Sequence, residues 1–289
     1  GHALITVLVI EEAPIGWDVS RAGIAGVPCQ CRLAALLFRK GSIMRVILIC
    51  CLLLPFTVQA DVIPDFVKDM AGAPISRSNP QAEPQEWLLA HVDVETTGLT
   101  PGYHEIIDVG VIITDLNGEE LDRLFLRIMP AHPDRAEAGA VAVNGFSIDR
   151  WTTRGYVSEA AAIDHWLDFH DRVVGSKSVL FVAYNAWFDI SFVDHLFRKQ
   201  GLTWRRLFHY FILDLPSMAW SHGLKGLAGG QLAIELELET ETDNPLEHTG
   251  ITGAEFNVRL YRALLAHALR QSKDNITDKG SESESAADQ

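Results

Sequence analysis

The pattern of apolar and polar positions along this chain is typical of strands before about residue 157 and of alternating helices and strands after it. Before that point, apolar or alternating runs at about 88–95, 105–114 and 121–129 are separated by short turns, which predicts three antiparallel strands. After it, apolar residues at helical spacing alternate with short apolar runs. The elements predicted there are helices over about 157–173, 188–200, 215–221, 224–236 and 252–270, and strands over 178–184 and 207–213. This order predicts an α/β domain over residues 87–270, with a mixed sheet of antiparallel and parallel strands flanked by helices.

The segment before the domain contains an apolar run that resembles an export signal. A basic start at Met44-Arg45, a short apolar core and a small-residue end at Ala60 predict a signal peptide over 44–60. A periplasmic or secreted protein, with no stable membrane anchor after cleavage, is therefore expected. A buried strand or helix is the alternative interpretation of the run.

The remaining segments outside the domain show no periodicity. Residues 1–43 are interpreted as a non-native extension upstream of a start codon at Met44. Residues 61–86 carry Pro, Ser and Ala without a pattern and are predicted to form a linker. Residues 271–289 are rich in serine and acidic residues and are predicted to be a disordered tail.

Charge and cysteine content narrow the range of functions. The formal net charge of the 289 residues is −14, whereas a protein that binds a long stretch of nucleic acid usually presents a basic face. All four cysteines precede residue 60, so the domain is expected to have neither a disulfide nor a cysteine zinc site. Its tryptophans are expected to pack within the fold and not to stack on bases: Trp151, Trp166, Trp187, Trp204 and Trp220.

Two acids in the first predicted strand are the strongest chemical signal. Asp93 and Glu95 are two residues apart, so their side chains should point to the same face. Carboxylates held side by side repel each other unless a proton or a cation joins them, which makes the pair a candidate divalent-metal site. A solvated strand face would show the same alternation, so these two residues alone leave both interpretations open.

Two further motifs follow in order along the chain. The segment 182–189 ends an apolar strand and opens a helix with Asp189, and Glu247-His248-Thr249-Gly250 precedes the last helix. Together, Asp-x-Glu-Thr-Thr-Gly-Leu, Asn-Ala-x-Phe-Asp and the final His resemble the DnaQ-like (RNase T-like, DEDDh) 3′–5′ exonucleases, from about residue 87 to residue 270.

This resemblance implies a ribonuclease H-like fold and a metal-dependent 3′–5′ exonuclease. Such an enzyme would hydrolyse single-stranded DNA or RNA from the 3′ end to nucleoside 5′-monophosphates, with two Mg²⁺ or Mn²⁺ ions. Asp93 would bridge both ions, Glu95 would bind the ion that carries the attacking water, and Asp189 would hold the second ion. His248 would be the general base. The residues matching the family's substrate-binding positions are Thr96, Thr97, Gly98, Leu99 and Asn185.

The chain departs from the family pattern in the last motif. The family places a fourth catalytic acid five residues after the histidine, and that position here is Gly253. Glu255 should face away from the site, about 200° further around the helix, while Glu247 could reach the site from its loop. A second and milder departure is Tyr184, where a histidine commonly precedes Asn-Ala.

Losing this acid predicts weak or absent turnover, because a small misplacement of the attacking water costs on the order of 100-fold in rate. The alternative is a catalytically silent relative that binds nucleic-acid ends or a protein partner. The sequence decides neither DNA versus RNA nor the oligomeric state.

Overall fold

The chain divides into two units, Gly1–Val62 and Ile63–Gln289, which are described separately. The computed structural model describes residues 6–8, 34–40, 43–47 and 79–287, and the side chains of residues 79–272. In the first unit, β1 (Thr6–Leu8) pairs in parallel with β2 (Ala34–Lys40), which pairs antiparallel with β3 (Ile43–Ile47). Strand β3 includes the start of the predicted signal peptide; residues 48–60 and most of the predicted linker lie outside the described residues.

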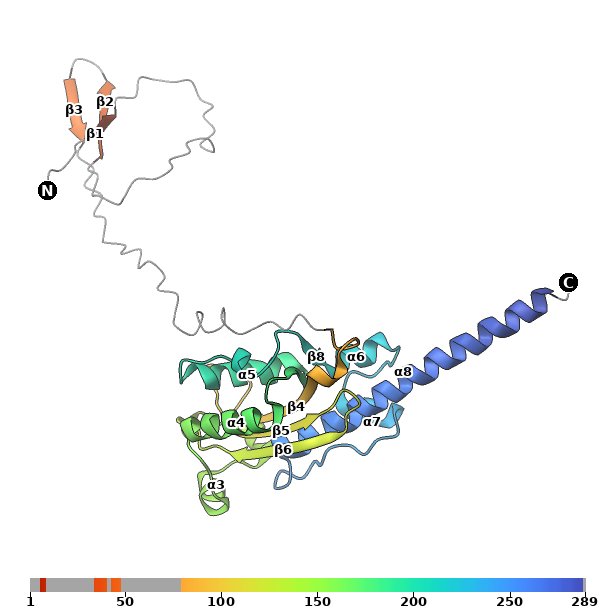
Figure 1. The fold of residues 1–289 in the computed structure, drawn as a ribbon. Helices are drawn as coiled ribbons and strands as arrows, with labels where there is room; N and C mark the ends of the chain where they lie inside the picture. Colours follow the sequence, from red (N-terminus) through yellow and green to blue (C-terminus); the bar gives the residue numbers. More distant parts are fainter. Residues whose placement is uncertain (1–5, 9–33, 41–42, 48–78, 288–289) are drawn as a thin grey trace. The chain divides into compact units, whose positions relative to one another are not determined.

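The second unit is built on a five-stranded mixed sheet with the order β6-β5-β4-β7-β8 (Figure 1). The central strand β4 pairs antiparallel with β5 and in parallel with β7, β5 pairs antiparallel with β6, and β7 pairs in parallel with β8. The strands span Trp87–Thr96 (β4), Ile106–Thr114 (β5), Glu120–Arg127 (β6), Ser178–Ala183 (β7) and Ile212–Asp214 (β8). The prediction of a mixed sheet flanked by helices is confirmed.

The last strand is shorter than predicted. Residues 207–211 lie outside β8, and the short 3-10 helix η4 (Trp204–Arg206) precedes them. This segment is apolar because part of it is buried: Leu207 and Phe208 pack into the core beside Phe181 and Trp166. An apolar run of this length does not distinguish a strand from a buried loop.

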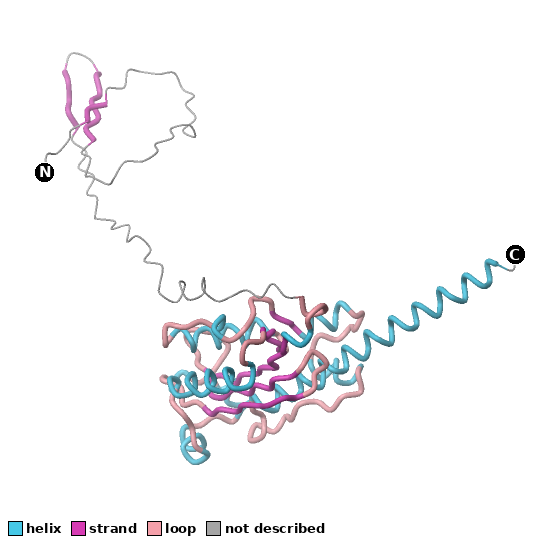
Figure 2. The backbone as a smooth tube through the Cα atoms, viewed as in Figure 1, coloured by secondary structure: helices cyan, strands magenta, loops and turns pink. Residues whose placement is uncertain are grey.

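Helices cover both faces of the sheet (Figure 2). Alternate residues of β4 point to opposite faces: Leu88, Ala90, Val92 and Val94 join the core formed with α4 and α5, whereas Trp87 and Leu89 join the core formed with α6, α7 and α8. The helices span Ala138–Asn144 (α2), Ile148–Arg154 (α3), Glu159–Val174 (α4), Ala186–Arg198 (α5), Leu215–Ser221 (α6), Gly229–Glu235 (α7) and Gly250–Ala287 (α8).

Helix α8 continues to residue 287, so the expectation of disorder over 271–289 is wrong for most of that segment. Nucleation, the unfavourable step of helix formation, takes place inside the domain, and adding residues to an existing helix is much less unfavourable, so the polar segment rich in serine and acidic residues prolongs it. None of the helices within the described residues offers a stretch long and apolar enough for a membrane span.

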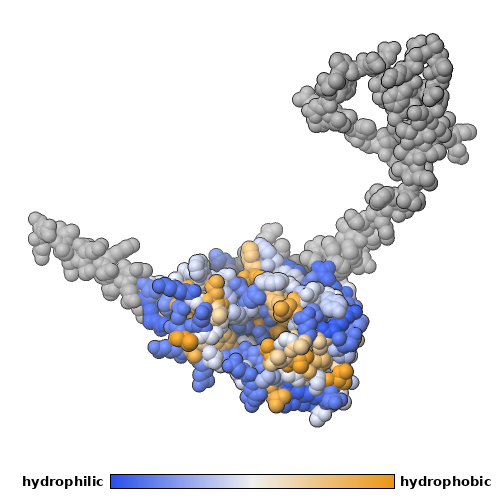
Figure 3. Space-filling model, turned by 180° about the vertical axis from the view of Figure 1, so that it is seen from behind, coloured by the Kyte–Doolittle hydropathy of each residue, from blue (hydrophilic) through white to orange (hydrophobic). Residues whose placement is uncertain are grey.

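The surface of the domain is mixed, with apolar residues gathered in places among polar ones (Figure 3). Trp151 and Trp166 are fully buried, as expected, but Trp187 and Trp220 are 59% and 65% exposed. The expectation that all five tryptophans pack within the fold is therefore wrong for these two. Both lie at the solvent side of short or starting helical turns, where the sequence periodicity is too brief to assign a face.

Candidate active site

Asp93 and Glu95 lie at the end of β4 on the face covered by α8. Their partners across the ladder are Gly110 and Asp108 of β5. Glu95 is buried, and Asp93 is half-buried. The two carboxylates therefore share one face of the central strand, beneath the first turns of the last helix.

Asp189 reaches the same place from the first turn of α5. Asn185 ends the connection from β7 in a left-handed conformation (φ 60°), which turns the chain sharply into the helix. The Asp189 carboxylate is buried and accepts a hydrogen bond from the backbone N–H of Val94, at 3.1 Å, between the two acids of β4. Side chains 96 positions apart in the sequence are thereby brought together.

The charges of these acids are not balanced by basic residues. Within the described residues, no Lys or Arg forms an ion pair with Asp93, Glu95 or Asp189. Burial raises the pKa of Asp93 well above its ordinary value, and repulsion from Asp189 and Glu95 raises it further. Burial likewise raises the pKa of Asp189, with a contribution from the charge of Glu95.

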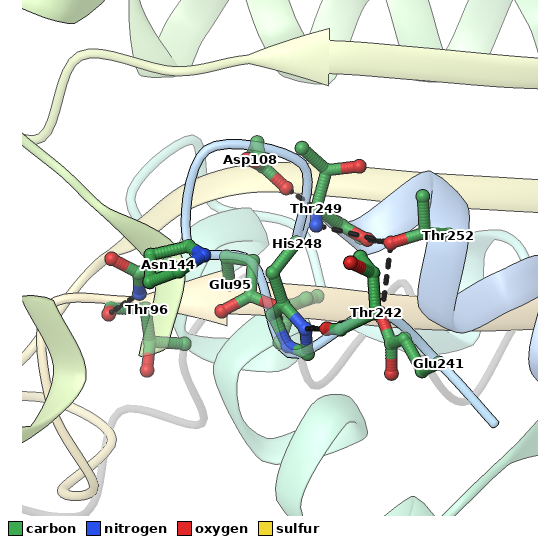
Figure 4. Close-up of polar contacts among 12 residues, drawn as sticks. Glu95, Thr96, Asp108, Asn144, Glu241, Thr242, His248, Thr249 and Thr252 are labelled. Carbon is green, nitrogen blue, oxygen red and sulfur yellow. Dashed lines mark hydrogen bonds and ion pairs between the residues drawn. The ribbon is translucent and has the colours of Figure 1, made fainter. Parts of the chain in front are cut away.

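His248 lies in the loop just before α8 and faces the carboxylate of Glu95 (Figure 4). Its Nε2 is 3.0 Å from Glu95 Oε1, and its Nδ1 is 2.9 Å from the carbonyl oxygen of Thr242. The hydrogen bond to Glu95 is the largest cause that raises the pKa of His248 to about 9. At neutral pH the protonated ring therefore pairs with Glu95.

Gly253 lies on α8 directly against Asp93. A Cβ atom built at this position would fall inside the van der Waals envelope of the Asp93 carboxylate, with even the farther oxygen only 2.9 Å away. The Asp93 side chain thus fills the space beside a helix position that has no side chain. The position five residues after the histidine thus faces Asp93, and here it supplies no carboxylate.

The two other acids considered from the sequence lie elsewhere. Glu255 forms an ion pair with Arg123 of β6, away from the site, as expected from its position on the helix. Glu247 is exposed, and its side chain has no hydrogen-bond or ion-pair partner among the described residues. The structure therefore does not bring Glu247 into the site.

Two acids that the sequence did not single out lie at the site. Asp108 is fully buried on β5, accepts a hydrogen bond from the backbone N–H of Gly250 at 2.7 Å, and has its pKa raised to about 7, chiefly by burial. Glu241 approaches His248 from the loop before α8. Asp108 could have been found from the sequence, because it is the one acid in the otherwise apolar run of β5. Glu241 could not, because it lies in a run of acids without a pattern.

Hydrogen bonds and one close glycine contact hold the loop after β4, which exposes one apolar side chain. Thr96 Oγ1 donates to the carbonyl of Gly98, and the Thr97 hydroxyl accepts from the N–H of Glu105. Gly98 packs so closely on the ring of His104 that a Cβ would be 2.6 Å from it. Leu99 is 73% exposed at the tip of the loop. The loop after β4 therefore presents an apolar side chain to the solvent.

The donor set fits a divalent cation in its chemistry. Mg²⁺ and Mn²⁺ prefer carboxylate oxygens, and Asp93, Glu95 and Asp189 provide three carboxylates whose mutual repulsion a cation would relieve. In this structure the three carboxylates contact other protein groups and do not surround a common point. Within the described part of the chain, no three acidic, His or Cys side chains are spaced to hold an ion. Asp93 rests against Gly253, and Glu95 is paired with His248.

Comparison with known proteins agrees with this geometry. The family model described as Exonuclease (RNase T) matches residues 91–261. Ribonuclease T of Shewanella frigidimarina is 27% identical over 184 residues, which covers 59% of this chain and 78% of that protein. The 3′-5′ DNA exonuclease Cap18 of Escherichia coli is 26% identical over 182 residues, covering 61% of this chain and 91% of that protein.

Other relatives are matched over only part of their length. A PolC-type DNA polymerase III of Listeria welshimeri is 30% identical over 147 residues, which are 51% of this chain and 9% of the polymerase. A solved structure of exonuclease I superposes with a TM-score of 0.51 at 17% identity, over 66% of this chain and 43% of that one, which shows a shared fold. Because the matched family model spans more than half of the chain and contains all three motifs, this protein belongs to the RNase T family of DnaQ-like (DEDDh) exonucleases.

Proposed function

We propose that this protein is a metal-dependent 3′–5′ exonuclease that removes nucleoside 5′-monophosphates from single-stranded nucleic-acid ends, with turnover reduced by Gly253. The observation that carries the proposal is that Asp93, Glu95, Asp189 and His248, from three separate segments, converge at the end of β4. Family membership supports the reaction class.

In this proposal, Asp93, Glu95 and Asp189 hold the divalent cations. Such ions, when bound, stabilise the charge on the attacking and leaving oxygens of the phosphodiester. His248 accepts the proton of the attacking water at Nε2, which requires a neutral ring. The ion pair between His248 and Glu95 must therefore open before the reaction, and binding of Glu95 to a cation would remove the negative charge that keeps the ring protonated.

The substrate contacts proposed for this chain are few. Leu99 would pack against the terminal base, while backbone groups of Thr97 and Gly98 would face its sugar and phosphate; Thr96 and Asn185 fix the two loops that surround the acids. With a net charge of −14, the chain is suited to gripping a few terminal nucleotides and not a long strand.

Gly253 weakens the site in two ways. It provides no carboxylate, and it leaves a space that the Asp93 side chain fills. The missing carboxylate and the position of Asp93 both weaken cation binding. We therefore expect Gly253 to reduce the rate of hydrolysis more than the affinity for the nucleic-acid substrate. The silent-binder alternative rests on this same glycine. The presence of Asp93, Glu95, Asp189 and His248 at one place supports the enzyme instead.

The test is degradation of a single-stranded oligonucleotide labelled at either end, with Mn²⁺, Mg²⁺ or EDTA. We expect metal-dependent shortening from the 3′ end that is abolished in Asp93→Ala, a variant that also excludes a contaminating nuclease. Folded protein that cleaves no faster than Asp93→Ala would favour the silent binder.

A further inference from the structure

Glu241 places a further carboxylate beside the catalytic histidine. It lies in the segment between α7 and α8, seven residues before His248, and 23% of its side chain is exposed. Its Oε1 is 3.5 Å from His248 Nδ1 and 2.9 Å from the hydroxyl of Thr252, the residue that precedes Gly253 (Figure 4). The carboxylate is thus held between the histidine and the first turn of α8.

The two nitrogens of His248 have different surroundings. Nε2 faces Glu95, a residue assigned to cation binding, while Nδ1 faces the carbonyl of Thr242 and the carboxylate of Glu241. A carbonyl and a carboxylate are both acceptors, so Nδ1 must carry a proton whatever the state of the ring. This arrangement leaves Nε2 as the only nitrogen that can accept a proton from water.

Holding Glu241 here has an electrostatic cost. Its charge repels those of Glu95 and Asp93, and burial disfavours the ionised form. An exposed position for this side chain would avoid both effects, as it does for Glu239 in the same loop. The Thr252 hydroxyl and the histidine are the groups that offset this cost, and both belong to the segment that forms the site.

We propose that Glu241 is a positioning residue for the reaction: beside the Thr242 carbonyl, which accepts the hydrogen bond of Nδ1, its carboxylate attracts the same side of the His248 ring and so helps to aim Nε2 at the attacking water. This role rests on the proposed exonuclease function. Glu241 adds a carboxylate from a loop, on the opposite side of the histidine from Glu95. The helix supplies no acid at the neighbouring position, Gly253.

The test compares Glu241→Ala, Glu241→Gln and the matched control Glu239→Ala in the full chain. We expect Glu241→Ala to lower kcat at least about 10-fold with KM and Mn²⁺ affinity, measured by calorimetry on metal-free protein, changed less than about 2-fold. Glu241→Gln keeps an acceptor for Nδ1 and should fall between Glu241→Ala and the native chain. The control should match the native chain in all three quantities.

A second readout does not depend on activity. The NMR signal of the His248 ring Cε1–H, assigned with His248→Asn, should shift or broaden in metal-free Glu241→Ala and stay in place in Glu239→Ala. An unchanged ring signal or an unchanged kcat in Glu241→Ala would overturn the positioning role. A large loss of Mn²⁺ affinity would also overturn it, by making Glu241 a cation ligand. A native chain that neither binds Mn²⁺ nor cleaves would instead refute the proposed function, and this role with it.

Discussion

His91 illustrates how a single buried side chain links the stability of this fold to pH. It lies on β4 two residues before Asp93, with Nε2 3.2 Å from the Thr114 hydroxyl and its ring edge-on to Tyr261. Burial, with a smaller effect of the positive charge of Arg262, lowers the pKa of His91 to about 3. The folded domain therefore holds this ring in its neutral form.

The first prediction concerns acid stability. Between pH 6.5 and about 3 the unfolded chain binds a proton at His91 and the folded chain does not, so the free energy of unfolding falls as the pH drops. The contribution reaches about 1.4 kcal/mol for each pH unit. In urea unfolding from pH 6.5 to 4.5, His91→Gln should lose this slope relative to the native chain, whereas exposed His165→Gln should keep it. Equal slopes for His91→Gln and the native chain would contradict this account.

At the residue scale, the sequence indicated which side chains meet at the end of β4, but not the side chains that support them. Asp93, Glu95, Asp189 and His248 stand in short ordered motifs, and the structure brings them together. Glu241 could not be predicted, because a loop conformation and not a local pattern carries it to His248. The filling of the Gly253 space by Asp93 depends on how closely the helix approaches the strand, which no pattern of residue types encodes.

At the scale of elements, the approach of α8 to the sheet decides the geometry of the site. Gly110 of β5 and Gly250 of α8 meet backbone to backbone, since a Cβ on Gly250 would lie 2.6 Å from the amide nitrogen of Gly110. Asp108 accepts from the N–H of Gly250, and Asn257 Nδ2 donates to the carbonyl of Val92 at 3.0 Å. These contacts fix the first turns of α8, and with them His248, over β4.

The second prediction tests this packing. In Gly110→Ala the new methyl group would collide with the backbone of Gly250 and Ile251, which cannot rotate away as a side chain can. We expect a loss of about 3 kcal/mol in the free energy of unfolding, measured by urea denaturation. Gly139→Ala, a helical glycine with open space around it, is the matched control and should be neutral or slightly stabilising. A Gly110→Ala variant as stable as the native chain would show that α8 lies farther from the sheet.

Elements with sustained periodicity were predicted well from the sequence. Among the short helices, α6 (Leu215–Ser221) matches its predicted range, whereas α2 and α3 were not predicted. Strands β4 to β7 and helices α4, α5 and α8 fall within a few residues of their predicted ranges, apart from the extension of α8. Helices α2 and α3 have seven residues each, too few for a period to be recognised. Contacts from distant residues support them, such as the hydrogen bond from Trp151 to the carbonyl of Ile107.

At the scale of the whole molecule, the net charge of −14 limits how this protein can hold nucleic acid. Several basic side chains of the domain also pair with its own acids, as in the pairs of Arg123 with Glu120 and of Lys199 with Glu105. Under the proposed function, we therefore expect contact with the strand to be confined to the few groups at the end of β4.

The third prediction follows from this charge. Binding of a single-stranded oligonucleotide should release few counterions, with a slope of log K against log salt no steeper than about −2, which corresponds to two or three neutralised phosphates. Fluorescence anisotropy of Asp93→Ala, which should bind without cleaving, would measure the slope in the presence of Ca²⁺. A slope of −5 or steeper would mean that a basic surface contacts the strand over a long footprint.

The most direct test of the account is the rate of nucleotide release from a 3′-labelled single strand in Mn²⁺, compared between the native chain and Gly253→Asp. We expect slow, metal-dependent release by the native chain and a rate about 10- to 100-fold higher in the variant, because the new carboxylate displaces Asp93 from the space that it fills and completes the ligand set. Gly253→Ala, which displaces Asp93 without adding an acid, should not reproduce the gain. No release by either folded protein, or equal rates in the native chain and Gly253→Asp, would contradict the claim that this is an exonuclease site lacking one carboxylate.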